Sequence, residues 1–361
     1  MSFASTLLNT SVVKIKFGIF YFSFVQDKRH LGFHNFVAYP CMFIQQSYKT
    51  MTDTFLTDIL TGFEMNPKTL PSKYFYDTAG SKLFQMIMQL PEYYLTKSEY
   101  EILDTQSNQI FKDFNPKSHF DIVEFGAGDG SKTKLLLKEF MARTNDFDYS
   151  PVDISISALE ELEENFRADL PNLNINLLND DYFSALESLK LRHTTKLVLF
   201  LGSNIGNFKD NREIQFLHSM RSNLNRGDYA LIGFDLKKDP HIILDAYNDK
   251  TGITREFNLK LLRRMNRELG ANFDIFSFTH FPTYNPINGE ARSFLVSLKK
   301  QTVNVGMSKI QFEYGEPIFM EVSKKYALAD LEKLSANSGF EIVQNYYDCK
   351  HYFLDSLWRA V

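Results

Sequence analysis

A run of glycines among acidic side chains has the make-up of a binding site for a nucleotide-like ligand. The run reads Glu124-Phe125-Gly126-Ala127-Gly128-Asp129-Gly130. Glycines let the backbone approach a ligand closely, and the N-terminus of a following helix favours a carboxylate or a phosphate. The spacing of these glycines differs from the dinucleotide fingerprint G-x-G-x-x-G, which argues against NAD.

Two further acidic positions follow the glycine run at informative distances. Asp153 ends a second predicted strand, where an acid can bind ribose hydroxyls, and Asp180-Asp181 follow a third, where they can contact an adenine. The carboxyl ends of strands are where open α/β sheets bind ligands. The three features in this order favour S-adenosylmethionine as the ligand. The alternative is that the glycines form tight turns and the acids cap helices.

The elements that must position these residues alternate between strand and helix. Apolar runs predict strands at 119–125, 149–154, 174–178, 196–201 and 228–236, with helices at 132–141, 157–166 and 212–224. Continuous apolar strands between helices predict a parallel sheet covered on both faces. A helix at 327–337 and strands at 340–347 and 352–361 then complete the order that is usual at the end of a class I methyltransferase sheet.

The predicted fold class is therefore α/β, a class I Rossmann-like sheet with an inserted α+β substrate domain. Residues 96–236 and 325–361 would form the cofactor-binding domain, and 237–324 would be the inserted substrate-recognition domain. A helical pattern begins at Thr52 and stops before Pro67, and we expect the segment 52–95 to join the insertion.

The first fifty residues fit none of these patterns. They are rich in Phe and Tyr, as in the stretch 17–25, with little periodicity. Lys14 and Lys16 precede that stretch, which would suit a degenerate signal or anchor, but no convincing cleavage site follows. The favoured interpretation is an extension that is disordered or loosely packed, produced by a start codon upstream of a natural start at Met51.

Composition excludes several other classes of protein. Among 361 residues the net charge is −4, which gives no broad basic surface, so we expect no nucleic-acid partner. Two cysteines, Cys41 and Cys349, make neither a disulfide framework nor a zinc cluster, so no metal site is expected. No apolar run is long enough to span a membrane. These features predict a cytoplasmic monomer.

Beyond the glycine run, long segments resemble the histidine-specific methyltransferase family, whose best-known member converts free L-histidine to trimethylhistidine (hercynine) on the way to ergothioneine. One such segment is Pro71-Ser72-Lys73-Tyr74-Phe75-Tyr76-Asp77. The resemblance runs from about residue 52 to the C-terminus, and its other segments are 80–84, 90–94, 200–207, 235–239, 246–249, 257–258, 266–269 and 321–323.

The resemblance implies a role for particular residues of this chain. The cofactor-binding positions of the family correspond here to Gly126, Gly128, Lys132, Asp153, Asp181 and Tyr182. The substrate positions correspond to Tyr76, Phe84, Tyr93, Gly202, Asn207, Tyr247, Glu321 and Ser323. Within this set, Tyr93, Asn207 and Tyr247 would hold the substrate carboxylate and Tyr76 would lie near its amine. Glu321 and Ser323 would contact the imidazole ring.

These residue types suit the implied roles. Phenols and an amide can donate hydrogen bonds to a carboxylate, and a carboxylate such as Glu321 accepts well from an imidazole N–H. Each residue also has an ordinary structural explanation: Tyr76 and Tyr93 as core aromatics, Asn207 as a turn residue, Tyr247 as helix packing. Glu321 and Ser323 share one face of a predicted strand, which could simply be exposed.

The proposed chemistry is an in-line attack of the substrate α-amine on the sulfonium methyl group. Tyr76 and Asn207 are the expected catalytic residues, with Tyr76 orienting the amine. Two departures from the family raise a second hypothesis, in which another amino acid or amine is methylated: Asn204 replaces the usual threonine, and Ser293 lies where the family often has methionine. A third hypothesis is a catalytically silent module that binds S-adenosylmethionine or histidine.

Overall fold

The computed structural model describes residues 10–17, 20–27 and 42–361 except 191–192, with side chains from residue 53 onwards except 157 and 188–189. It divides into two compact units, Met1–Thr57 and Asp58–Val361. In the first unit, β1 (Thr10–Phe17) and β2 (Phe20–Asp27) form an antiparallel pair. The remaining part of the predicted extension, 1–9, 18–19 and 28–41, lies outside the described residues. Helix α1 (Met42–Glu64) begins ten residues before the predicted Thr52.

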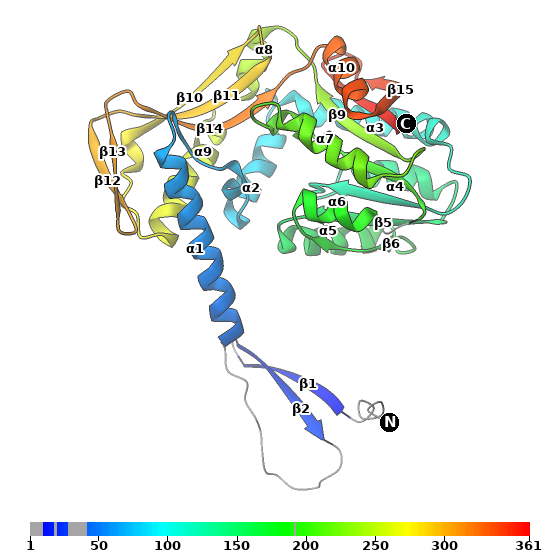
Figure 1. Cartoon of the computed structure of the whole chain (residues 1–361), viewed down its shortest axis with the longest axis horizontal. Helices are drawn as coiled ribbons and strands as arrows, with labels where there is room; N and C mark the ends of the chain where they lie inside the picture. The colour runs from blue at the N-terminus through cyan, green and yellow to red at the C-terminus, as the bar shows by residue number, and fades with distance from the viewer. Residues whose placement is uncertain (1–9, 18–19, 28–41, 191–192) are drawn as a thin grey trace. The chain divides into compact units, whose positions relative to one another are not determined.

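The second unit contains an eight-stranded sheet in the order β15-β16-β9-β8-β4-β5-β6, with β7 also paired to β5. Its members are β4 (Phe120–Phe125), β5 (Phe147–Asp153), β6 (Asn174–Ile175), β7 (Leu178–Asn179), β8 (Thr195–Phe200), β9 (Tyr229–Asp235), β15 (Phe340–Tyr347) and β16 (Phe353–Ala360). All pairings among β9, β8, β4, β5, β6 and β7 are parallel, whereas β16 is antiparallel to both of its neighbours, β9 and β15. This arrangement confirms the predicted class I methyltransferase sheet (Figure 1).

Helices cover both faces of this sheet, as the continuous apolar strands predicted. On one face lie α6 (Tyr182–Leu189), α7 (Arg212–Asn223) and α10 (Leu328–Ser338), and their apolar side chains join one buried cluster with Phe125 and Phe200. On the other face lie α3 (Tyr94–Phe114) and α4 (Thr133–Met141). Phe120 makes ring contacts there with Phe114 and Phe140, at 5.1 and 6.3 Å between centroids. Helix α5 (Ile156–Asp169) packs against β5, where its Phe166 stacks on Tyr149 at 5.6 Å between ring centroids.

The prediction of a single strand at 174–178 was wrong, because the chain forms two short strands there, β6 and β7. Both strands pair with β5. Strand β6 lies opposite Asp148 and Tyr149, and β7 lies opposite Val152 and Asp153. Between these positions β5 contains Pro151, whose nitrogen faces the same side as that of Tyr149 and carries no hydrogen. The missing donor interrupts the ladder, so the edge strand is divided in two.

A second sheet carries the residues predicted to contact the substrate. It has the order β10-β11-β14-β3, formed by β10 (Phe278–Asn285), β11 (Glu290–Ser297), β14 (Pro317–Lys324) and β3 (Lys68–Thr69). Around it lie η1 (Ser72–Phe75), α2 (Thr78–Met88), α8 (Pro240–Ala246), α9 (Ile253–Glu268), η3 (Ile275–Ser277) and the hairpin β12 (Gln301–Val305) and β13 (Ser308–Phe312). The N-terminal segment therefore contributes β3 to the sheet of the insertion, although the domain boundaries themselves stay predictions.

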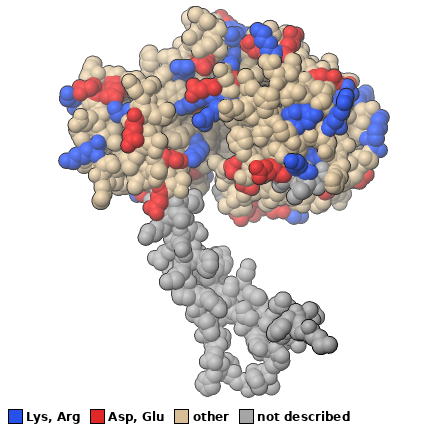
Figure 2. All heavy atoms as spheres, viewed as in Figure 1, with Lys and Arg blue, Asp and Glu red and all other residues tan. Residues whose placement is uncertain are grey.

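Two features of the structure concern membranes and highly charged partners, namely the length of the helices and the distribution of surface charge. Among the described residues, no helix is both long enough and apolar enough to cross a membrane. Basic and acidic side chains are mixed over the face of Asp58–Val361 that Figure 2 draws, rather than gathered into one large patch of a single sign.

Candidate functional site

The glycine loop joins the end of β4 to the start of α4. Gly126, Gly128 and Gly130 all have positive φ, at 70°, 57° and 66°, a conformation that side chains with a Cβ rarely adopt. The N–H of Gly126 donates to the carbonyl of Val152, at 2.9 Å, which ties the loop to β5. A Cβ on Gly126 would lie 2.7 Å from the hydroxyl of Tyr182, whereas a Cβ on Gly128 would meet nothing within 4 Å. The loop backbone is thus open at Gly128.

The two predicted acidic contacts take different positions beside this loop. Asp153 is half-buried at the end of β5, and its carboxylate accepts from the N–H of Ser155 at 2.9 Å. Burial raises the pKa of Asp153 above its usual value. Asp181 is exposed and caps α6, accepting from the N–H groups of Phe183 and Ser184 at 2.9 and 3.2 Å. Asp181 therefore has the helix-capping role that the sequence left as the alternative, and its contact with a cofactor stays a prediction.

Lys132, a predicted cofactor residue, is paired with a carboxylate that sequence reasoning missed. The Lys132 ammonium forms an ion pair with the fully buried Glu99 of α3. The other oxygen of Glu99 accepts from the N–H of Gly202, at 2.6 Å. A Cβ on Gly202 would lie 3.6 Å from Nζ of Lys132 and 3.6 Å from Nδ2 of Asn204. Glu99 therefore joins the helix side of the glycine loop to the loop that follows β8.

Further buried acids surround this ion pair. Burial raises the pKa of Glu124 to about 7, although Thr133 and Tyr149 donate to its carboxylate. Asp355 is fully buried on β16, and burial together with the charge of Glu99 raises its pKa well above the usual value.

Four aromatic residues predicted to contact the substrate form a continuous row. Tyr76 packs on Phe84 with 5.6 Å between ring centroids, Phe84 on Tyr93 with 6.3 Å, and Tyr93 on Tyr247 with 6.4 Å. Phe257 of α9 also packs against Tyr76 and Phe84, at 5.8 and 6.0 Å between ring centroids. Segments far apart in the sequence are thus brought together as the resemblance implied.

Burial changes the chemistry of this row. It raises the pKa of Tyr76, Tyr93 and Tyr247 well above the usual value, and nearby charged or phenolic groups add to the shift, with Glu321 among them in each case. All three phenols are therefore neutral over the physiological range, and each can donate one hydrogen bond. Tyr182, beside the glycine loop, also contributes to the shift of Tyr76.

Glu321 and Ser323 lie on one face of β14, next to this row. The hydroxyl of Tyr247 lies 2.8 Å from Oγ of Ser323. Glu321 is half-buried, and burial raises its pKa to about 7 while the charge of Lys325 opposes the increase. Within the part of the chain that the structure describes, the Glu321 carboxylate has no hydrogen-bond or ion-pair partner.

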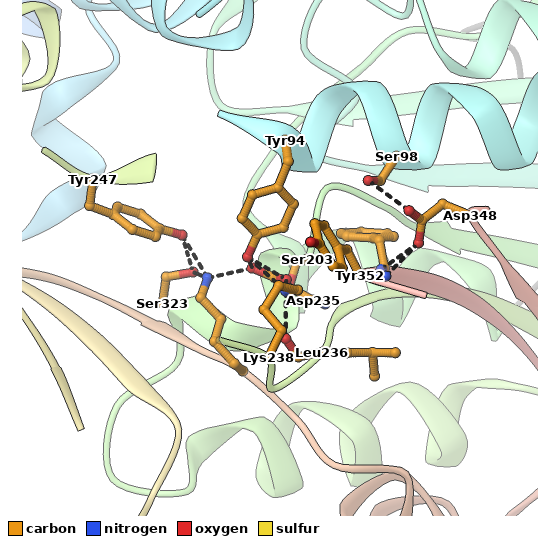
Figure 3. A network of polar contacts seen from close by, with 12 residues as sticks. Tyr94, Ser98, Ser203, Asp235, Leu236, Lys238, Tyr247, Ser323, Asp348 and Tyr352 are labelled. Atoms are coloured by element: carbon orange, nitrogen blue, oxygen red, sulfur yellow. Dashed lines mark hydrogen bonds and ion pairs between the residues drawn. The ribbon is translucent and has the colours of Figure 1, made fainter. Parts of the chain in front are cut away.

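Behind these side chains lies a buried charged cluster that sequence reasoning also missed (Figure 3). Its centre is Asp235, the last residue of β9, which is fully buried and pairs with Lys325 at 2.7 Å. Lys238 forms a second ion pair with Asp235, and Tyr94 donates to it at 2.8 Å. The N–H of Asp235 donates to Oγ of Ser203, at 3.0 Å.

The other residues that were singled out from the sequence are Asn207, Asn204 and Ser293. Asn207 ends the short helix η2 (Asn204–Asn207) and is exposed. Asn204 lies against the glycine loop, since its Nδ2 is 3.3 Å from the position of a Cβ on Gly126. Ser293 is buried and directly opposite Glu321 in the register of β11 and β14. Its Oγ lies 3.4 Å from Nε2 of His280, whose pKa burial lowers to about 4.

A separate group of polar side chains lies at the opposite ends of the strands. Potential metal-ligand atoms of His119, Asp121 and Asp148 lie within 4.8 Å of one another and line a hollow with His193. His119 is already paired with Asp146, at 2.9 Å, and Asp148 accepts from Asn174. Because β4 and β5 begin here and end at the glycine loop, this hollow is not part of the candidate site.

Two residues of the buried charged cluster, Lys325 and Asp235, could have been identified from sequence patterns. Lys325 continues the two-residue alternation of Glu321 and Ser323 one residue beyond the end of β14, which predicts that it points to the same side. Asp235 stands at the carboxyl end of a predicted strand, in the same position that singled out Asp153. Glu99 had no such signal, because it lies within an amphipathic helix where an acid is usually exposed.

The sequence of this chain is similar to those of known methyltransferases. The family model described as histidine-specific methyltransferase, SAM-dependent, matches residues 55–360. The chain is 35% identical to histidine N-alpha-methyltransferase of Mycobacterium tuberculosis over 74% of this chain and 83% of that protein. It is 34% identical to the protein of the same name from Mycolicibacterium smegmatis, over 78% and 87%. A more distant relative, 26% identical over 78% and 86%, is L-tryptophan methyltransferase trpM of Psilocybe serbica.

Proposed function

We propose that this chain, a member of the family of histidine-specific, S-adenosylmethionine-dependent methyltransferases, adds three methyl groups to the α-amine of free L-histidine. The product would be hercynine, a precursor of ergothioneine. That the chain is an S-adenosylmethionine-dependent N-methyltransferase follows from the family. The identity of the acceptor and the number of transfers are the proposal.

The residues at the glycine loop fit the cofactor. The backbone at Gly128 is open, and Asp153 stands at the end of the neighbouring strand, where its carboxylate can accept from ribose hydroxyls. Tyr182 and Asn204 stand over Gly126 and limit the room on that side. Lys132, Asp181 and Tyr182 complete the proposed cofactor contacts.

The single observation that supports histidine most strongly is the unpartnered carboxylate of Glu321. A half-buried carboxylate with a pKa raised to about 7 gains from a hydrogen-bond donor that carries partial or full positive charge. An imidazole ring supplies such an N–H group. Ser323, on the same face of β14, offers a hydroxyl to the second ring nitrogen.

The row of phenols supports a substrate with a free carboxylate and amine. Tyr93 and Tyr247 are neutral donors beside the charged cluster, so they can bind the carboxylate, and Asn207 and Gly202 are the other proposed contacts. Tyr76 is the phenol at the other end of the row from Tyr247, next to Phe84, and its neutral hydroxyl suits a role in orienting the amine. Tyrosine and phenylalanine rings around the amine would also stabilise a methylated ammonium by cation–π contact.

The proposed reaction is a direct displacement. When bound, S-adenosylmethionine supplies a methyl group on a positive sulfur. In each transfer the neutral α-amine nitrogen forms the new bond to this carbon, and the carbon–sulfur bond breaks with its electron pair going to sulfur. After the first and second transfers an amine proton is released to solvent, whereas the third transfer gives a quaternary ammonium that has no N–H. The contribution of the protein is alignment of the amine by Tyr76 and of the carboxylate by Tyr93, Tyr247 and Asn207.

A second candidate is the same reaction on a different amino acid or amine. The observation that favours it is the polar pair formed by Ser293 and His280 directly across from Glu321. Asn204 is a further departure from the family, beside Gly126. The relative named L-tryptophan methyltransferase is an example of a similar protein that is named for another acceptor.

One incubation tests these alternatives. The protein is mixed with S-adenosylmethionine and either L-histidine or a panel of other amino acids, and products are followed by mass spectrometry. Histidine carrying one, two and then three methyl groups is the expected result. Methylation of a different amino acid with none of histidine would favour the second candidate. Calorimetric binding of both ligands without any product would favour a silent binding module. A monomeric state and a cytoplasmic location stay proposals.

A further inference from the structure

The Lys325 ammonium has three hydrogens and three acceptors in the fold. It donates to Oδ2 of Asp235 at 2.7 Å, to the hydroxyl oxygen of Tyr247 at 2.7 Å and to Oγ of Ser323 at 2.8 Å. The side chain of Lys325 has no exposed surface. Since an ammonium has three donors and no acceptor, Lys325 has no hydrogen left for a ligand, and it acts only through the groups it holds.

Two hydroxyl hydrogens remain to be placed on Tyr247 and Ser323. Their oxygens lie 2.8 Å apart, so one hydrogen occupies the space between them whichever hydroxyl donates it. Both oxygens already accept from Lys325. The pair of hydroxyls therefore has one hydrogen to offer outside the triangle, and both predicted substrate contacts depend on the same lysine.

The positive charge of Lys325 is buried behind this triangle, and the charge of the neighbouring Lys238 is also opposed by the buried Asp348. Lys325 and Lys238 share the single carboxylate of Asp235, and the three side chains are 0%, 6% and 0% exposed. The charge of Lys325 lowers the pKa of both Tyr93 and Glu321, in opposition to burial, so its field reaches both ends of the predicted substrate. A buried charge acts strongly here because little water screens it.

We propose that Lys325 is a positioning residue for the amino-acid substrate, which fixes the hydroxyls of Tyr247 and Ser323 and supplies a buried positive charge that favours a free carboxylate. The inference rests on the proposed function, since it assumes that the substrate is an amino acid lying against Tyr93 and Tyr247. It adds that recognition of the carboxylate is electrostatic, through a lysine that does not touch the substrate.

Lys238 provides a matched control for this role. Lys325→Met leaves Asp235 paired with Lys238, and Lys238→Met leaves it paired with Lys325, so each variant keeps one ion pair and loses one buried ammonium. The partners of Lys238 are Asp235, Tyr94 and the carbonyl of Leu236, so its removal leaves the triangle intact. Thermal unfolding and calorimetric binding of S-adenosylmethionine establish that both variants fold.

The decisive measurement compares L-histidine with L-histidinamide, in which a neutral amide replaces the carboxylate. For the wild type we expect a higher kcat/KM for histidine. Lys325→Met should raise KM for histidine about tenfold or more and reduce the preference over histidinamide by a similar factor, whereas Lys238→Met should change the preference less than about threefold. A purely structural lysine would lower activity on both substrates alike.

Equal changes of the preference in the two variants, or an unchanged preference in Lys325→Met, would overturn the proposal. If Lys325→Met does not fold, Lys325→Gln is the second variant, because its amide keeps two donors without the charge. Its expected result is a reduced preference for histidine, and an unchanged preference would again overturn the proposal. Failure of the proposed function has a different signature, since the wild type itself would then methylate neither compound.

Discussion

The hydroxyl groups of Tyr247 and Ser323 lie 2.8 Å apart although 76 positions separate them in the chain. Tyr247 follows α8 and Ser323 is on β14, so both belong to the segment inserted after β9. Lys325 joins this pair to Asp235, which is the last residue of β9 in the main sheet. The residues predicted to contact the substrate are thus attached directly to the sheet that carries the glycine loop. Such an anchor can keep a methyl donor and an acceptor aligned.

Replacing Glu321 by Gln should weaken histidine binding while leaving cofactor binding unchanged. Gln keeps the size of the side chain but loses the charge that strengthens a hydrogen bond from the ring. The loss should be about 1.5–3 kcal/mol, or roughly a 10- to 150-fold higher KM for histidine. Calorimetry with S-adenosylmethionine is the control, and an unchanged KM would rule out the contact between Glu321 and the ring.

The pKa of Glu321 also predicts a dependence on pH. Burial raises it to about 7 from an ordinary value of 4.5. The folded protein therefore holds this proton more strongly than the unfolded chain does, so the stability that Glu321 contributes is present below about pH 4.5 and is lost as the pH rises towards 7. Over the same range the carboxylate becomes a better acceptor, so histidine affinity should increase.

Comparison with Glu321→Gln isolates these two effects. Glu124 also has a pKa raised to about 7, and histidine itself titrates, but both contributions are shared by the wild type and the variant. Between pH 5 and pH 8, urea unfolding should show the free energy of unfolding of the wild type falling relative to that of the variant. Parallel curves would mean that Glu321 is ionised throughout this range.

Much of this fold could be read from local patterns. Continuous apolar strands such as 196–201 predicted a sheet buried on both faces, and β8 (Thr195–Phe200) occupies its centre. The division of the edge strand into β6 and β7 was missed because its cause, Pro151, lies on the neighbouring strand. The family positions brought Tyr76, Phe84, Tyr93 and Tyr247 into consideration, and the fold places them in one row.

The charged side chains behind the site were harder to predict. Lys325 and Asp235 are 90 positions apart, and their pairing depends on how the inserted segment packs on the end of β9. Single-sequence periodicity carries no information on such a contact. Asp181 shows the opposite difficulty, because the same residue type both caps helices and binds ligands, and a sequence pattern does not separate the two.

Gly128→Ala should weaken cofactor binding more than it destabilises the fold. Its φ of 57° gives alanine a strain of about 1 kcal/mol, and the new Cβ would enter the open space proposed for the cofactor. We expect the Kd for S-adenosylmethionine to rise about tenfold or more, from an overpacking cost of about 1–3 kcal/mol.

Gly270→Ala is the matched control for this variant. Gly270 has a φ of 62°, and a Cβ there also meets nothing within 4 Å, so the backbone strain is the same. Thermal unfolding should show a similar loss of stability in both variants, while calorimetry should show weakened cofactor binding for Gly128→Ala alone. Equal cofactor affinities would place the cofactor elsewhere on the loop.

Asp355→Asn should be tolerated and should remove part of the pH dependence of stability. The Asp355 carboxyl is fully buried, and burial together with the charge of Glu99 raises its pKa well above the usual value. Asn is a neutral group of similar shape, so stability at pH 5 should change little. Above that pH the wild type should lose up to about 1.4 kcal/mol per pH unit relative to the variant. Urea unfolding at pH 5 and pH 8 measures the difference, and a variant less stable at pH 8 would show that Asp355 is ionised.

Tyr76→Phe should lower kcat for histidine while leaving its KM nearly unchanged. The ring contacts with Phe84 and Phe257 remain in the variant, so the loss is confined to the hydroxyl that is proposed to orient the amine. Removing one hydrogen bond that acts on the reacting amine should slow turnover by about tenfold. Tyr74→Phe is the control from the same segment, because its hydroxyl donates to Asp58 at 2.7 Å. That control should cost about 1 kcal/mol of stability without changing kcat. If Tyr76→Phe instead raised KM with kcat intact, the hydroxyl would contribute to binding of the substrate and not to alignment of its amine.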